Sequence, residues 1–148
     1  MNCKLKKCAC ITLVMASAWC AMAYKPAYGG WSAELNPDTG LEQLRSVKGL
    51  NENEVFAAGD YGTVLRNDNT QWFEIEFPDI RTVYGIWCSS ENDIFFAGDM
   101  GTIYRYQGGI WSQITSNTLN RLRDIWGTSA NDIYSVGEKG TIVHYDGT

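Results

Sequence analysis

The sequence predicts an all-β protein made of repeated units, each holding four short antiparallel strands. The first observation is a repeat, since the number of residues from Gly59 to Gly98 equals the number from Gly98 to Gly137. The second is composition, because 15 Gly, 13% aromatic residues and only 3 Pro in 148 residues favour short strands joined by tight turns. The third is that no segment after residue 24 has the apolar spacing of an amphipathic helix.

The same interval recurs at other positions. It relates Gly62, Gly101 and Gly140; Thr63, Thr102 and Thr141; Val55, Ile94 and Ile133; Asn53, Asn92 and Asn131; Trp72 and Trp111; and Trp87 and Trp126. Four strands in a repeat of about 40 residues are typical of β-propeller blades. We therefore expect a partial β-propeller of three repeats, at about residues 41–79, 80–118 and 119–148.

The middle repeat shows its four strands most clearly. They are predicted at residues 83–87, 94–97, 102–106 and 111–114. The equivalent segments are 44–48, 55–58, 63–67 and 72–75 in the first repeat, and 122–126, 133–136 and 141–145 in the third. Residues 59–62 have the length of a hairpin turn, and glycine adopts a positive φ without steric penalty. We therefore expect Gly62, Gly101 and Gly140 to adopt positive φ at the ends of such turns.

The segment 1–23 has the pattern of a signal peptide. Three lysines come before residue 8, an apolar run occupies residues 8–23, and the run ends in small residues at Ala21 and Ala23. A run of that length is shorter than the roughly 20 residues of a spanning helix. We expect cleavage after Ala23 and export to the periplasm or the medium. An uncleaved membrane anchor, or lipid attachment at Cys20, are the alternatives.

Removing the signal peptide changes the charge and the cysteine count. Residues 24–148 lose three lysines and no acidic residue, so the formal net charge goes from −5 to −8. This acidic balance argues against a nucleic-acid partner, which needs a basic face. Cys88 is the one cysteine that remains, so an internal disulfide cannot form. It takes the position of Gly49 and Gly127, which we interpret as a loop, where an exposed thiol could react.

The third repeat carries a family resemblance. Residues 122–137 read Leu-Arg-Asp-Ile-Trp-Gly-Thr-Ser-Ala-Asn-Asp-Ile-Tyr-Ser-Val-Gly, and residues 140–148 read Gly-Thr-Ile-Val-His-Tyr-Asp-Gly-Thr. Together they resemble the BNR (Asp-box-like) repeat of exported bacterial propellers, a group that includes sialidase-type propellers and propeller factors that assist photosystem II assembly. The resemblance covers roughly residues 41–148 and implies the fold, because the repeated residues are mostly architectural. The Asp-box pattern Ser-x-Asp-x-Gly-x-Thr-Trp is not met, and residues 145–148 come closest to it.

Two tryptophans are candidate ligand-binding residues. Trp87 and Trp126 each close the first strand of a repeat, where an aromatic ring could form a platform for a sugar or a peptide. The alternative is that each ring fills the space between adjacent blades. Lys48 holds the equivalent position in the first repeat, which interrupts any ring of such platforms.

A set of basic residues is the second candidate. Arg66, Arg105 and His144 share one repeat position and could bind an anion or a carboxylate ligand. An acidic set lies six residues earlier on the same hairpins, at Asp60, Asp99 and Glu138. Cross-strand salt bridges between the two sets are the alternative interpretation.

The sequence gives little support for catalysis. The likeness to sialidase-type propellers implies converging arginines with a tyrosine nucleophile, and the six arginines of residues 24–148 do not assemble into such a triad. His144 is the single histidine and no nucleophile motif accompanies it. No His/Cys cluster suits zinc, and no EF-hand loop suits calcium. We therefore expect no enzyme activity, no catalytic residues, no metal and no cofactor.

Two functions remain open. The first is a non-catalytic exported propeller that binds a partner protein or serves in assembly, and the second is a carbohydrate-binding, lectin-like propeller. A fragment related to glycoside hydrolases ranks third.

The expected three repeats leave open how the propeller is completed. Residues 30–35 resemble an outer strand without a blade of its own, so Trp31 to Glu34 of one copy could complete the third blade of another. A homodimer would then close a six-bladed ring. The competing interpretation is a piece of a longer propeller gene.

Overall fold

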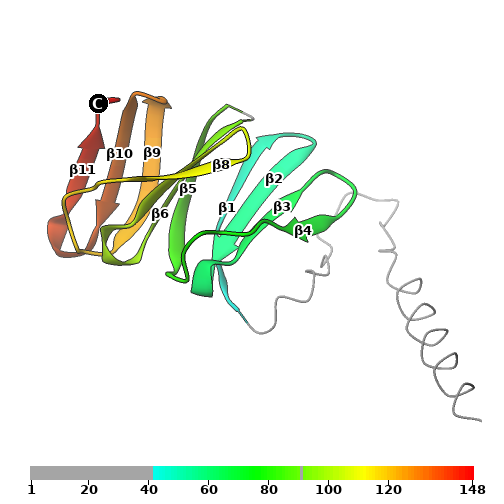
Figure 1. The fold of residues 1–148 in the computed structure, drawn as a ribbon, viewed down its shortest axis with the longest axis horizontal. Coiled ribbons are helices and arrows are strands. Elements are labelled where there is room, and N and C mark those ends of the chain that lie inside the picture. The colour runs from blue at the N-terminus through cyan, green and yellow to red at the C-terminus, as the bar shows by residue number, and fades with distance from the viewer. Residues whose placement is uncertain (1–41, 91) are drawn as a thin grey trace, which may run out of the picture. The chain divides into compact units, whose positions relative to one another are not determined.

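The computed structural model describes residues 42–90 and 92–148 (Figure 1). All described residues belong to one compact unit. The predicted signal peptide and the predicted outer strand at residues 30–35 lie outside the described residues. In the part described, no helix is long and apolar enough to cross a membrane.

Three antiparallel sheets follow one another along the chain, and we call them blades 1, 2 and 3 (Figure 1). Blade 1 contains β1 (Leu44–Asn51), β2 (Glu54–Gly59), β3 (Val64–Asn67) and β4 (Trp72–Glu74). Blade 2 contains β5 (Val83–Ser90), β6 (Asp93–Gly98), β7 (Ile103–Gln107) and β8 (Ile110–Ile114). Blade 3 contains β9 (Leu122–Ser129), β10 (Asp132–Gly137) and β11 (Ile142–Tyr145). Strands pair in chain order, so the predicted all-β fold of antiparallel blades is confirmed.

The first strand of each blade is longer than predicted. Gly49, Cys88 and Gly127 pair with residues of the second strand instead of starting a loop. A register irregularity between Cys88 and Ser90 lets the ladder continue to the hairpin end. The interpretation of position 88 as a loop was therefore wrong, since Cys88 is a half-buried strand residue.

The turns between second and third strands need the predicted glycines. Short 3-10 turns lie at η1 (Asp60–Gly62), η2 (Asp99–Gly101) and η3 (Glu138–Gly140). Gly62, Gly101 and Gly140 have φ of 74°, 70° and 71°, which confirms the prediction. The residue before each glycine is also left-handed, at Tyr61, Met100 and Lys139.

Adjacent blades pack through apolar faces. One cluster buries Phe56, Ala58 and Val64 of blade 1 with Val83, Ile86, Ile94 and Phe96 of blade 2. A second buries Trp87, Phe95, Ala97 and Ile103 of blade 2 with Leu122, Ile125 and Ile133 of blade 3. Because equivalent repeat positions supply the covering residues in each cluster, one type of contact joins both pairs of blades. Burying each large side chain contributes about 1.5–3 kcal/mol.

The connection from blade 1 to blade 2 is anchored by an aromatic contact. Phe77 lies on this connection, and its ring meets the Trp111 ring edge-on with centroids 4.9 Å apart. The Trp111 indole N–H donates a 2.9 Å hydrogen bond to the carbonyl of Glu76. Trp111 of β8 therefore holds the segment that leads into β5.

Candidate functional site

Three arginines gather where the first strands begin, beside the η turns. Arg45 and Arg123 are the second residues of β1 and β9, and Tyr84 holds the same position in β5. Arg121 comes just before β9. We call Arg45, Arg121 and Arg123 the arginine row. The row exists because the antiparallel register brings the start of each first strand beside the turn after the second strand, as Leu44 opposite Gly59 shows.

Each arginine of the row is ion-paired. Arg45 donates to both carboxylate oxygens of Asp60, at 2.9 and 3.0 Å. Arg123 donates to Glu138 at 2.6 Å within blade 3. Arg121 connects two blades, because it donates to Asp99 of blade 2 at 2.5 Å and to Glu138 of blade 3 at 3.3 Å.

Tyr84 makes the arginine row continuous. The guanidinium groups of Arg121 and Arg123 lie 5.0 and 5.4 Å from the centre of the Tyr84 ring, within the range of cation–π attraction. Arg45 is near enough for its charge to be felt by Tyr84 and to be repelled by the charge of Arg121. The surface therefore joins positive groups from blades 1 and 3 across a tyrosine of blade 2.

Two carboxylates of this surface, Asp60 and Glu138, have pKa values below their ordinary range. The hydrogen bond from Arg45 lowers the pKa of Asp60, and the hydrogen bond from Arg123 lowers the pKa of Glu138. The arginine side chains are between 35% and 52% exposed, so they face solvent while their partners fix their orientation. Oriented guanidinium N–H groups suit a carboxylate or a peptide carbonyl.

The predicted basic residues have other partners than expected. Arg66 forms an ion pair with Glu54. Arg105 donates to both oxygens of Asp93, at 2.6 and 2.8 Å, and His144 lies 2.9 Å from Asp132. Salt bridges on the hairpins do form, but the predicted partners were wrong. Asp60, Asp99 and Glu138 pair with the arginine row instead.

Strand register explains this correction. Arg66 lies opposite Phe56 in the ladder, and Arg105 lies opposite Phe95. Glu54 lies two residues before Phe56 and on the same face of the sheet. It is therefore a diagonal neighbour of Arg66, within reach of the arginine side chain. Asp60 is in the turn, at the other end of the hairpin. The predicted basic residues and the arginine row therefore lie at opposite ends of the strands.

The two candidate tryptophans have different environments. Trp87 is 7% exposed and packs among residues of blades 2 and 3, so its ring offers no platform on this surface. Trp126 is 58% exposed. His144 stacks on Tyr134 with ring centroids 4.2 Å apart, and Tyr134 lies opposite Trp126 in the ladder. Trp126 and His144 therefore share one face of blade 3.

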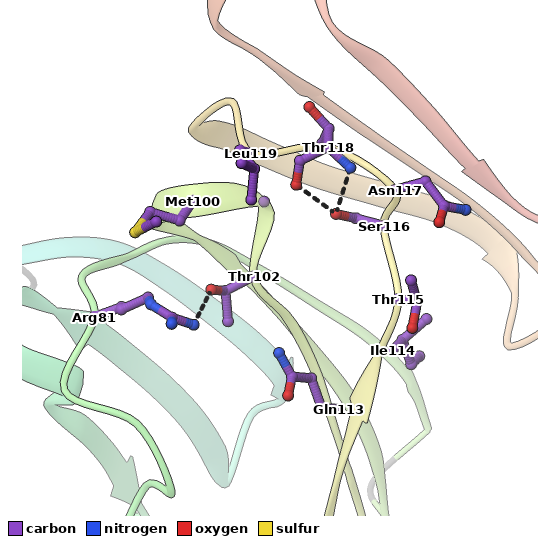
Figure 2. A pocket seen from close by; sticks show the side chains of 11 residues that line it. Arg81, Met100, Thr102, Gln113, Ile114, Thr115, Ser116, Asn117, Thr118 and Leu119 are labelled. Atoms are coloured by element: carbon purple, nitrogen blue, oxygen red, sulfur yellow. Dashed lines mark hydrogen bonds between the residues drawn. The ribbon is translucent and has the colours of Figure 1, made fainter.

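A polar hollow of about 500 Å³ lies beside η2 (Figure 2). Its lining comes from η2, the end of β8 and the segment that leads to β9, with Gln113, Ser116 and Asn117 among the polar side chains. Arg81 also borders it and donates to Thr102 at 3.1 Å, as Figure 2 shows. Hydroxyl and amide groups of this kind can hydrogen-bond a neutral polar ligand. Within residues 42–90 and 92–148, no three His, Cys, Asp or Glu side chains are grouped as metal ligands.

Comparison with known proteins supports the fold. No family model matches the sequence, and no curated protein matches it. Among solved structures, the chain is similar to "YCF48 bound to D1 peptide", with a TM-score of 0.68 at 15% sequence identity. The match covers 82% of this chain and 41% of that chain, so the present chain spans less than half of its length. At this identity the likeness shows a β-propeller fold.

Sequence reasoning missed the arginine row. Arg45 and Arg123 occupy one repeat position, but Tyr84 stands between them in the sequence and Arg121 belongs to a different position. The repeat did identify the acidic residues of the turns, but we expected their partners on the same hairpin. The detectable signal was the strand register, which sets residue 45 beside residue 60.

Proposed function

We propose that this chain is an exported, non-catalytic β-propeller that binds an extended segment of a partner protein along the arginine row. The observation that carries the proposal is that Arg45, Tyr84, Arg121 and Arg123 lie at the same end of three successive blades, with Arg121 and Arg123 over the Tyr84 ring. A structure of similar fold holds a peptide, which supports a peptide as the class of ligand.

The chemistry of the surface fits an extended peptide. Asp60 accepts from two N–H groups of Arg45, and the arginine side chain is 39% exposed. A peptide could bind by its carbonyl groups or a terminal carboxylate, and an aromatic side chain could stack near Tyr84. Because the guanidinium groups are already oriented, binding needs little further ordering of the arginines.

Peptide display followed by fluorescence anisotropy tests the proposal. Peptides selected on the purified protein would be labelled and measured against wild type, the double variant Arg121→Gln/Arg123→Gln and the control Arg66→Gln. We expect the double variant to lose affinity by about tenfold or more. Arg66 lies at the opposite end of blade 1, so the control should bind like wild type. Failure to select any peptide, or an equal loss in the control, would contradict the proposal.

Export and the lack of catalysis are part of the same proposal. Export rests on the pattern of residues 1–23, and intact-mass analysis of secreted protein should find Ala23 removed with the signal. The lack of catalysis rests on the arginine row, in which each arginine is already ion-paired with a carboxylate, and on the absence of a nucleophile motif beside His144 in the sequence. Turnover of a sialoside or another glycoside substrate would contradict it. Membership of the BNR repeat family also remains a proposal, carried by residues 122–137.

Carbohydrate binding is the second candidate function. The hollow beside η2 favours it, because hydroxyl and amide side chains dominate its polar lining. A glycan array tests this function. Binding that free sugar prevents, and that the variant Gln113→Ala weakens, would favour carbohydrate binding over peptide binding. The homodimer predicted from the sequence also remains a proposal, and it does not depend on the arginine row.

A further inference from the structure

The hollow beside η2 has an unusual charge for this protein. The chain carries 17 acidic and 12 basic residues. Among the described residues that line the hollow, none is Asp or Glu, and Arg81 is the one that carries a positive charge. The hollow measures about 500 Å³, which is within the range of pockets that hold small ligands (Figure 2). A hollow of this composition favours an anion over a cation.

The first repeat has acidic residues at the equivalent positions. Gln113, Thr115 and Thr118 of the second repeat stand where the first repeat has Glu74, Glu76 and Asp79. Arg81 stands where the first repeat has Glu42. The turns beside the two places are alike, since Gly62 and Gly101 have φ of 74° and 70°. The second repeat therefore keeps the backbone of the first and removes its carboxylates.

Arg81 is placed to bind an anion in the hollow. Its Nη1 donates to Asp79 at 2.9 Å and to Thr102 at 3.1 Å, and these bonds hold the guanidinium at the border of the hollow (Figure 2). Both bonds use Nη1, and a guanidinium has three further N–H groups on Nε and Nη2. The Arg81 side chain is 40% exposed. A carboxylate can therefore bind Arg81 in addition to Asp79.

The rest of the lining suits an acidic side chain with an aliphatic stem. Gln113 and Ser116 supply an amide N–H and a hydroxyl, which can donate to a carboxylate. Met100 and Leu119 also line the hollow, and both are exposed. Their apolar side chains can contact methylene groups. Glutamate matches this lining better than aspartate, because it has one more methylene group.

The hollow borders the arginine row at Asp99. The Asp99 carboxylate accepts from Arg121 of the row at 2.5 Å. The Asp99 backbone N–H donates to the carbonyl of Thr82 at 3.0 Å. Met100 follows Asp99 in the chain, Arg81 precedes Thr82, and both line the hollow. A segment bound along the arginine row can therefore place a neighbouring side chain in the hollow.

We propose that the hollow binds the side chain of a glutamate in the partner segment, a proposal that rests on the proposed function of the arginine row. The glutamate carboxylate accepts from Arg81 and Gln113, and its stem lies against Met100 and Leu119. The arginine row also suits carboxylates and carbonyl groups. The two parts of the surface therefore select an acidic peptide.

A blocked amino acid tests the hollow by itself. N-acetylglutamate N-methylamide would be titrated into the isotopically labelled protein and followed by nuclear magnetic resonance, with the corresponding glutamine derivative as the neutral comparison. We expect saturable shifts of the Gln113 side-chain amide with the glutamate derivative and at least about tenfold weaker binding of the glutamine derivative. Absence of saturable shifts, or equal binding of the two derivatives, would overturn the proposal.

Two variants locate the response. Gln113→Glu restores the carboxylate that Glu74 supplies in the first repeat, so the fold should tolerate it while binding of the glutamate derivative falls by about tenfold or more. Arg66→Gln removes a cation at the opposite end of blade 1 and should leave the response unchanged. Circular dichroism would confirm that both variants are folded. An equal loss in the two variants would contradict binding in the hollow.

Peptides selected by display test the glutamate within a longer segment. Each glutamate of a selected peptide would be replaced by glutamine, and the affinity measured by fluorescence anisotropy with wild type and with Arg81→Gln. One replacement should cost about tenfold with wild type and much less with Arg81→Gln, because the cation is then absent. Peptides that bind through the arginine row but tolerate every such replacement would overturn the proposal and leave the proposed function standing. If no peptide is selected, the proposed function fails, and the blocked glutamate still decides whether the hollow binds this side chain.

Discussion

Arg121 of blade 3 donates a 2.5 Å hydrogen bond to Asp99, a residue of η2 in blade 2. The same guanidinium lies 5.0 Å from the centre of the Tyr84 ring, which also belongs to blade 2. One side chain therefore connects two blades by charge and by aromatic contact.

The first prediction concerns this connection. Arg121→Met should lower the melting temperature measurably, because it removes the ion pair with Asp99 and the cation–π contact with Tyr84 while keeping most of the aliphatic stem. Lys139→Met is the control, since Lys139 is exposed at the tip of η3. Differential scanning calorimetry of both variants makes the comparison. An equal effect in the two variants would show that Arg121 does not join the blades.

The second prediction compares two glycines at one repeat position. Gly101 and Gly140 both have positive φ, so alanine is strained at each, at a cost of about 1–2 kcal/mol. A Cβ at Gly101 would also lie 2.0 Å from the carbonyl oxygen of Thr118, whereas a Cβ at Gly140 meets nothing within 4 Å. We expect Gly101→Ala to destabilise by more than about 3 kcal/mol and Gly140→Ala by about 1–2 kcal/mol. Urea unfolding measures both values. Equal losses would mean that the clash with Thr118 relaxes freely.

The third prediction concerns pH. Hydrogen bonds from Arg45 and Arg123 lower the pKa of Asp60 and of Glu138 below their ordinary values. A carboxyl with a lowered folded-state pKa contributes stability that is present above its unfolded pKa and is lost as pH falls through the folded pKa. Stability should therefore be steady from neutral pH down to about 5 and fall below about 4. Chemical unfolding at each pH measures it.

The control for the pH prediction removes the two cations. In Arg45→Gln/Arg123→Gln the pKa values of Asp60 and Glu138 should return toward their ordinary range. The decline of stability in acid should then be shallower than in wild type. An unchanged pH profile would show that these two pairs contribute nothing to acid sensitivity.

The repeat predicted most of the fold because one set of positions determines both strands and turns. Gly62, Gly101 and Gly140 marked the turns, and the alternating apolar residues between them marked strands that the structure confirms within a few residues. The left-handed conformation of Tyr61, Met100 and Lys139 was not predictable from residue type, because these side chains have no preference for positive φ. The following glycine and the surrounding strands impose it.

The candidate site was harder to predict than the fold. A repeat aligns equivalent positions, but Arg121 joins Asp99 across blades, and such contacts depend on how sheets stack. The two tryptophans illustrate the same limit. Trp87 and Trp126 are equivalent in sequence, and their exposure differs because blade 3 covers only the first of them.

The fourth prediction concerns Cys88. Burial in β5 raises the pKa of its thiol to about 12, so almost none of the reactive thiolate exists at neutral pH. The folded protein should react with a thiol reagent much more slowly than the unfolded chain does in urea. Absorbance after addition of Ellman's reagent measures both rates. Equal rates would contradict the burial of Cys88.

The last prediction compares Trp87 with Trp126. Trp87 packs against Phe95, with ring centroids 5.7 Å apart, and is covered by blade 3. Trp87→Ala should destabilise the chain by about 3–5 kcal/mol, because it leaves a cavity between two blades. Trp126→Ala should cost less than about 1 kcal/mol, because its ring is 58% exposed. Urea unfolding measures both values, and equal losses in the two variants would contradict the burial of Trp87 between blades 2 and 3.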